Sequence, residues 1–206
     1  MRPVPFSAVW MAVSAAILLA GSALPASLTT ASLTIMLDFK GPYSDRSVDE
    51  MKREFEGIVK NSGLTIDWRL RSSSELEQLT FNNLVVVRFK GKCILEPVGY
   101  LYDERGPLAF TYSTGGVVQP YSEVACDKVA ATVRSAMFGG DFAKPDELLG
   151  RALGRVVAHE LIHMLSKSGA HGRAGVAKAA LSGKLLIAPD LPLDPADLRR
   201  LRAIGQ

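Results

Sequence analysis

Residues 155–172 read Arg-Val-Val-Ala-His-Glu-Leu-Ile-His-Met-Leu-Ser-Lys-Ser-Gly-Ala-His-Gly and contain all three histidines of the 206-residue chain. His159 and His163 are four residues apart, so on a helix both imidazoles lie on one face, close enough to bind one metal ion. Glu160 is rotated by about 100° from His159 around the helix. Its carboxylate can therefore reach a water on that metal without binding the metal itself. This HExxH spacing predicts a helix that carries a metal site for zinc-assisted hydrolysis.

A third ligand has to come from beyond this helix. We expect the helix to end at Gly169, because glycine readily adopts the left-handed conformation that terminates helices. His171 follows two residues later and is expected to turn back toward the metal. Three neutral imidazoles and one water would form the open tetrahedral site that is typical of catalytic zinc. We therefore predict Zn²⁺ as the cofactor, His159, His163 and His171 as its ligands, and Glu160 as the catalytic residue.

The same residues resemble the zincin metallopeptidases, and within them the metzincins, which carry HExxHxxGxxH. The resemblance is strict over His159, Glu160 and His163 only. Seven residues separate His163 from His171, where the metzincin pattern has five. No Met follows His171, so the Met-turn of the metzincins is missing. Together with Gly-Val-Ala-Lys at 175–178, the stretch is also similar to a group of uncharacterised secreted bacterial proteins with predicted metallopeptidase motifs.

This resemblance implies an α+β, zincin-like fold in one domain over residues 32–206. Such a fold has a mixed, twisted β-sheet, a crossover helix packed on a long HExxH helix, and a small C-terminal subdomain. The implied function is a zinc-dependent peptidase that hydrolyses peptide or protein substrates, with Glu160 as the general base for a zinc-activated water. Two alternatives remain open: a zinc-stabilised binding or structural module without catalysis, and a zinc hydrolase of non-peptide amides.

Two further roles stay open at the level of sequence. An aspartate among Asp190, Asp194 and Asp197 is a possible metal ligand, although these residues fit the pattern of turn and cap residues. Stabilisation of the oxyanion could come from zinc alone or from a residue of the 108–121 region, such as Tyr112 or Tyr121. An edge strand at 108–113 is our candidate for pairing with an extended peptide substrate, as zincins do; the alternative is an ordinary meander strand.

The first 26 residues are predicted to be a signal peptide. Arg2 precedes an uncharged apolar run over residues 8–20, and small residues at 21–26 offer cleavage sites. We expect cleavage between residues 23 and 31, a secreted or periplasmic location, and no stable membrane association after cleavage. An uncleaved N-terminal anchor is the alternative, but the run is short for a membrane span. The net charge of +3, without a basic cluster, gives no indication of nucleic-acid binding.

The remaining pattern alternates between strands and helices. A capping box at 47–50 predicts the start of a helix that Gly63 ends, and Pro145 marks the start of the HExxH helix. The strand, helix and strand over 33–70 indicate a βαβ unit. Strands are expected at 33–39, 64–70, 83–89, 98–102, 108–113 and 117–121, and further helices at 122–137 and 194–203.

Cys93 and Cys126 are the two cysteines of the chain. In an exported protein they favour a disulfide, which would stabilise the fold by roughly 3 to 4 kcal/mol in the loop-entropy model. Two buried free thiols are the alternative.

Overall fold

The computed structural model describes residues 31–71, 83–96 and 106–204. Within these ranges, none of the helices combines the length and the apolar character that a membrane span needs. The predicted signal peptide over residues 1–26 and the predicted strand at 98–102 lie outside the described residues.

The described strands form one five-stranded mixed sheet, as predicted. The strands are β1 (Ala31–Phe39), β2 (Leu64–Leu70), β3 (Leu84–Lys90), β4 (Ala109–Thr114) and β5 (Val117–Ala125). Their order is β2-β1-β3-β5-β4; the first four run parallel, and β4 is antiparallel to β5 at one edge. Parallel pairing of β1 with β2 confirms the strand–helix–strand unit.

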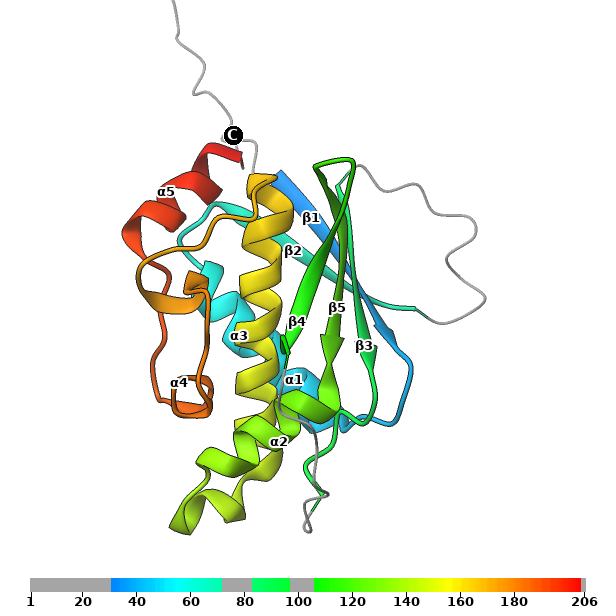
Figure 1. Cartoon of the computed structure of the whole chain (residues 1–206), viewed down its shortest axis with the longest axis vertical. Coiled ribbons are helices and arrows are strands. Elements are labelled where there is room, and N and C mark those ends of the chain that lie inside the picture. Colours follow the sequence, from blue (N-terminus) through cyan, green and yellow to red (C-terminus); the bar gives the residue numbers. More distant parts are fainter. Residues whose placement is uncertain (1–30, 72–82, 97–105, 205–206) are drawn as a thin grey trace, which may run out of the picture.

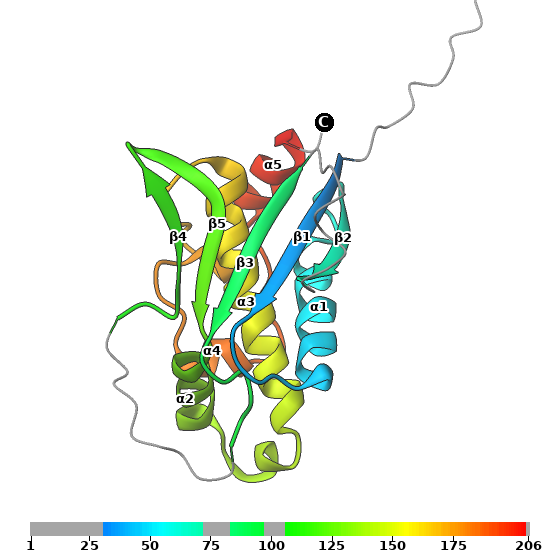
Figure 2. The ribbon, with the colours of Figure 1, turned by 90° about the vertical axis from the view of Figure 1, so that its right-hand side faces the viewer.

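The described residues contain five α-helices and form an α+β fold. The helices are α1 (Asp45–Val59), α2 (Cys126–Ala136), α3 (Pro145–Ser166), α4 (Gly183–Ile187) and α5 (Pro195–Ile204). Helices α1, α3, α4 and α5 lie on one face of the sheet, and α2 lies below the end of β5 (Figures 1 and 2). Two short 3₁₀ turns, η2 (Gly139–Ala143) and η3 (Gly175–Ala177), flank α3 in the chain. Figure 1 shows α3 between the sheet and the C-terminal segment of η3, α4 and α5.

Helix α3 is the centre of the core. It contacts the sheet through β4 and β5, and it contacts all four other α-helices. Its apolar residues are buried nearly all round the helix, among them Leu149, Leu153 and Val157, each with no exposed surface. A helix that is apolar on every side is stable only in the interior of a protein. This burial explains why the stretch with the histidines organises the rest of the chain.

Two predicted boundaries are wrong. Helix α1 begins after Ser44, whose hydroxyl caps it, and not at Ser47. Ser47 lies inside the first turn, and its hydroxyl donates instead to Asp146 on α3, at 3.0 Å. The strand predicted at 117–121 extends to Ala125, so α2 starts at Cys126 and not at residue 122. Strand β5 is longer because residues 121–125 pair in parallel with 86–90 of β3.

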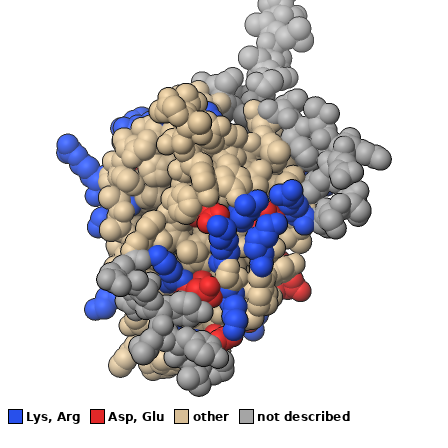
Figure 3. Space-filling model, turned by 45° about the vertical axis from the view of Figure 1, so that its right-hand side comes forward, with Lys and Arg blue, Asp and Glu red and all other residues tan. Residues whose placement is uncertain are grey.

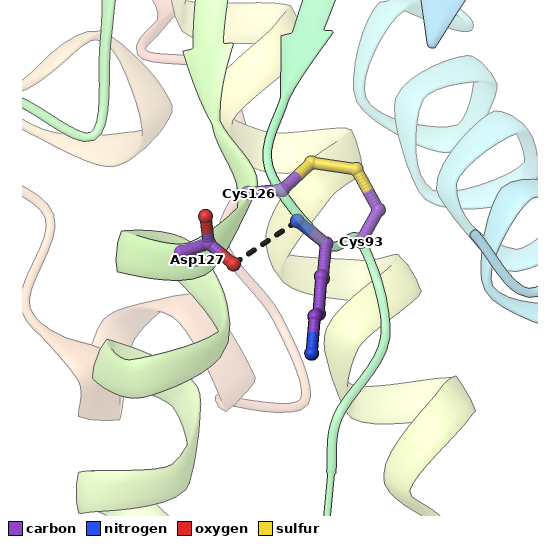
Figure 4. The surroundings of a disulfide bond; sticks show 4 residues. Cys93, Cys126 and Asp127 are labelled. Carbon is purple, nitrogen blue, oxygen red and sulfur yellow. Dashed lines mark hydrogen bonds between the residues drawn. A yellow bond between two sulfur atoms is a disulfide. The ribbon is translucent and has the colours of Figure 1, made fainter. Parts of the chain in front are cut away.

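The predicted disulfide between Cys93 and Cys126 is present. It joins the segment after β3 to the start of α2 (Figure 4). Both cysteines are buried in the core. Beside the disulfide, the carboxylate of Asp127 accepts a hydrogen bond from the backbone N–H of Lys92, at 3.0 Å.

Candidate metal centre

The three predicted ligands come together in space. His159 and His163 lie one turn apart on α3, and His171 follows in the segment after the helix. Their potential ligand atoms all lie within 4.8 Å of one another. The ring centroid of His171 is 4.8 Å from that of His163 and 5.3 Å from that of His159. These three imidazoles could therefore hold a metal ion.

The turn that returns His171 differs from the predicted one. Lys167, and not Gly169, takes the left-handed conformation that ends α3, with φ of 51°. The backbone N–H groups of Lys167 and Ser168 both donate to the carbonyl of His163. The chain reverses at Lys167, and the carbonyl of Ser168 lies beside the His163 ring.

Backbone carbonyls orient two of the imidazoles. Nδ1 of His159 lies 2.9 Å from the carbonyl oxygen of Val176, and Nδ1 of His163 lies 2.7 Å from that of Ser168. A carbonyl can only accept, so both Nδ1 atoms donate and both Nε2 atoms carry lone pairs. The two Nε2 atoms face each other at 3.1 Å. Two lone pairs at this distance repel each other, and a cation between them would convert that repulsion into attraction.

His159 is held in the neutral form that metal binding requires. Burial lowers the pKa of His159 from 6.5 to about 4, and the neighbouring His163 and His171 lower it further. The hydrogen bond to the Val176 carbonyl raises the pKa of His159, but by less than burial lowers it. At neutral pH the ring is therefore uncharged, as a metal-ligating imidazole must be.

Glu160 is buried beside the histidines, with 4% of its surface exposed. Its Oε2 accepts a hydrogen bond from the hydroxyl of Thr111 on β4, at 2.6 Å. Burial raises the pKa of Glu160, while the hydrogen bond from Thr111 and the proximity of His163 lower it in part. A carboxylate with a raised pKa is suited to accept and return a proton near neutral pH.

The contact between Thr111 and Glu160 was not predicted from the sequence. Thr111 is the third residue of β4 and its side chain faces α3, since its hydroxyl also lies 3.3 Å from the Glu160 carbonyl oxygen. The sequence places Thr111 within the edge strand predicted at 108–113. No pattern within that strand distinguishes it from its neighbours, so the contact depends on how β4 lies against α3.

A cavity of about 830 Å³ opens over the histidines and Glu160. One wall is α3, a second is β4 with the residues before it, and a third is the segment 178–181. The alternative aspartate ligands do not reach the histidines. Asp194 accepts from the backbone N–H of Ala196 at the start of α5, and Asp197 pairs with Arg200. In the described part of the chain, the cluster that could hold a metal ion consists of the three histidines alone.

Tyr112 and Tyr121 lie on the opposite face of the sheet. The Tyr112 hydroxyl donates to Glu123 at 3.5 Å, and the Arg88 guanidinium lies 5.3 Å from the centre of the Tyr121 ring. Arg88 also binds Asp38, at 3.1 Å. Figure 3 shows a group of Lys and Arg side chains interspersed with a few acidic ones on the face that it draws. None of the described tyrosines lines the cavity. Neither candidate therefore lies where an oxyanion next to Glu160 would form.

A scan of the chain against protein-family models found no match, and a search of curated proteins found none either.

Proposed function

We propose that the protein is a secreted or periplasmic zinc-dependent peptidase of the zincin type. The observation that carries this proposal is the position of Glu160. Its buried carboxylate lies beside three converging imidazoles on the wall of one cavity. The mixed sheet, with the antiparallel edge strand β4 along that cavity, is consistent with the zincin fold.

The donor set suits zinc. Zn–N bonds of about 2.0–2.1 Å in a tetrahedral site place two ligand nitrogens about 3.3 Å apart. The Nε2 atoms of His159 and His163 are 3.1 Å apart, close to that spacing. With His171 as the third ligand, the fourth position would face the cavity, which is the arrangement of catalytic zinc sites.

The proposed reaction is hydrolysis of a peptide bond. Zinc, when bound, supplies the Lewis acid that activates a water molecule and polarises the scissile carbonyl. Glu160 takes the proton from the attacking water and then delivers it to the leaving amine. The hydrogen bond from Thr111 holds the Glu160 carboxylate in place for both proton transfers. Because none of the described tyrosines lines the cavity, zinc itself is our proposed stabiliser of the oxyanion.

Strand β4 is the proposed binding element for the substrate backbone. It pairs with β5 along one edge and is the last strand of the sheet in the described residues, so its other edge can pair with an extended peptide. Residues 108–111 and Ser113 line the cavity, which places this edge next to the histidines. A peptide added to β4 would therefore pass its backbone close to Glu160.

Glu160→Gln tests the function against a zinc-stabilised structural module. We expect the variant to retain about one zinc per chain, because the three imidazoles are unchanged. Its kcat on a mixed peptide panel should fall at least about a hundredfold, as expected for loss of a general base. Glu147→Gln, at the surface of the same helix, is the matched control and should behave as wild type.

Two results would contradict the proposal. Equal rates of hydrolysis by the wild type and the Glu160→Gln variant would show that Glu160 is not the general base. A zinc-loaded wild type that hydrolyses no peptide in the panel would support the structural module instead.

A further inference from the structure

Lys178 brings a positive charge to the cavity beside the histidines. It follows η3, and its backbone forms a parallel bridge with Gly172, the residue next to His171. Its half-buried side chain lines the same cavity as His159, Glu160 and His163. Lys178 and the edge strand β4 thus contribute to the wall of the same cavity.

The segment that carries Lys178 is fixed to the metal centre on both sides. The backbone N–H of Gly172 donates to the carbonyl of Ala177, at 2.8 Å, and that of Val176 donates to Pro192, at 3.2 Å. The Val176 carbonyl also accepts from His159 Nδ1. Val176 and Ala177 are buried. The backbone of Lys178 therefore keeps a fixed position relative to the proposed ligands.

The ammonium group of Lys178 has no carboxylate partner in the described part of the chain. Other lysines of the same structure do have one: Lys40 pairs with Asp38 and Lys90 with Glu123. Among the described residues that line the cavity, Lys178 is the only lysine or arginine, and Glu160 is the only acidic residue. Glu160 in turn is bound by Thr111. A half-buried cation without a partner at the edge of a binding cavity is suited to bind an anionic group of a ligand.

We propose that Lys178 is a specificity-determining residue that selects substrates with a carboxylate close to the scissile bond. This inference rests on the proposed peptidase function. In peptides such a carboxylate has two sources, the side chain of Asp or Glu and the free C-terminus. Zinc at the histidines would add to the positive potential in the cavity and strengthen the preference for an anion.

The hydrolysis experiment compares blocked peptides that differ in one group. One pair carries Glu or Gln at a single position, scanned across the three residues on either side of the bond. A second pair keeps Gln but ends in a free carboxylate or an amide. We expect the wild type to prefer the carboxylate member of at least one pair by about tenfold in kcat/KM, typical of a charge-assisted hydrogen bond. The pair that shows the preference identifies the source of the carboxylate.

Variants assign the preference to Lys178. Lys178→Gln should reduce the ratio of kcat/KM between the carboxylate member and the uncharged member to about one. Lys178→Glu should reverse the preference by repelling a carboxylate. Lys184→Gln is the matched control, since Lys184 is exposed on α4 and lies outside the cavity. It should keep the wild-type ratio.

A binding measurement separates failure of this inference from failure of the peptidase function. Fluorescence anisotropy of the same labelled peptides is measured on zinc-loaded Glu160→Gln protein, with and without Lys178→Gln. Tighter binding of the carboxylate members that disappears with Lys178→Gln supports the inference, even if no peptide is cleaved. Cleavage and binding without any carboxylate preference would overturn the inference and leave the peptidase function intact.

Discussion

At the scale of single residues, Glu160, the proposed general base, is bound by a residue from another element. The Thr111 hydroxyl on β4 donates to Glu160 on α3, across the boundary between sheet and helix. Burial raises the pKa of Glu160. The hydrogen bond from Thr111 is the larger of the two effects that lower this pKa, and the proximity of His163 is the smaller. The position and the protonation of the base are therefore both set partly by Thr111.

Thr111→Val removes this hydrogen bond with little change in volume. Because the bond lowers the pKa of Glu160, we expect the acid limb of the kcat/KM profile to move to higher pH. At neutral pH kcat/KM should fall by about tenfold, the scale of one hydrogen bond to a charged group. Thr111→Ser keeps the hydroxyl and should retain the wild-type profile. An unchanged acid limb in Thr111→Val would show that the contact does not influence the base.

The lowered pKa of His159 predicts how the free energy of unfolding of the metal-free protein depends on pH. The pKa of His159 is about 4 in the folded protein and 6.5 as a free side chain. Above pH 6.5 the ring is neutral in both states and contributes nothing. Between pH 6.5 and 4 only the unfolded chain binds the proton, so the free energy of unfolding decreases by about 3 kcal/mol as the pH falls. Below pH 4 this contribution levels off.

Urea unfolding of chelator-treated protein from pH 7 to pH 4 measures this effect. His159→Gln should remove this part of the pH dependence. His171→Gln, which replaces an exposed imidazole, should keep it. If the free energy of unfolding changes with pH in the same way in the wild type and in His159→Gln, burial does not lower the pKa of His159.

At the scale of elements, α3 is held between α1 and the C-terminal segment. The buried Arg155 of α3 binds Glu54 of α1 at 2.7 Å and also donates to the carbonyls of Leu185 and Pro189. A buried guanidinium is tolerated when its donors are satisfied in this way. Arg155 lies one turn before His159, so it fixes the C-terminal segment next to the candidate metal centre.

The crossing of α1 over α3 depends on glycines. A Cβ at Gly150 would lie 2.5 Å from both the Ser47 carbonyl oxygen and the Glu50 Cβ, and a Cβ at Gly154 would lie 2.7 Å from the Met51 carbonyl oxygen. Helix α1 therefore occupies the space beside both glycines. The glycines weaken α3 by about 1 kcal/mol each relative to alanine, and close packing of the two helices compensates for this cost.

Gly150→Ala should therefore destabilise the protein although alanine favours helix. We expect the free energy of unfolding to fall by about 1 to 3 kcal/mol. The free-energy cost of overpacking is larger than the gain from the higher helix propensity of alanine. Gly57→Ala in α1 is the control, since a Cβ there meets nothing within 4 Å. It should stabilise the protein by up to about 1 kcal/mol. Urea unfolding compares the two variants, and stabilisation by both would contradict the tight crossing.

At the scale of the whole molecule, the disulfide closes a loop that includes strands β4 and β5. Cys93 and Cys126 are 33 residues apart. Replacing both with alanine should lower the free energy of unfolding by about 3 to 4 kcal/mol, because the unfolded chain regains the entropy of the open loop. Urea unfolding measures the difference. Dithiothreitol should destabilise the wild type by a similar amount and leave the double variant unchanged; an effect on both would point to another cause.

Local pattern alone predicted much of the fold and the candidate ligands. The four-residue spacing of His159 and His163 places two imidazoles on one helix face wherever that helix packs. Pro145 begins α3 as expected, and the predicted strands and helices within the described residues occur in the predicted order, whereas the short helix α4 was not predicted. The disulfide was predicted from two cysteines in a chain that is expected to be exported. These features depend on helix and strand geometry, or on composition, and need no knowledge of distant contacts.

Tertiary structure decided the features that depend on contacts between distant segments. Thr111 reaches Glu160 only because β4 lies along α3. The chain reverses at Lys167, and not at Gly169, with the Ser168 carbonyl beside His163. Lys178 lines the cavity because its segment returns to pair with Gly172. Such contacts join residues that local periodicity cannot relate, so the sequence specified the chemical groups and the packing decided which of them meet.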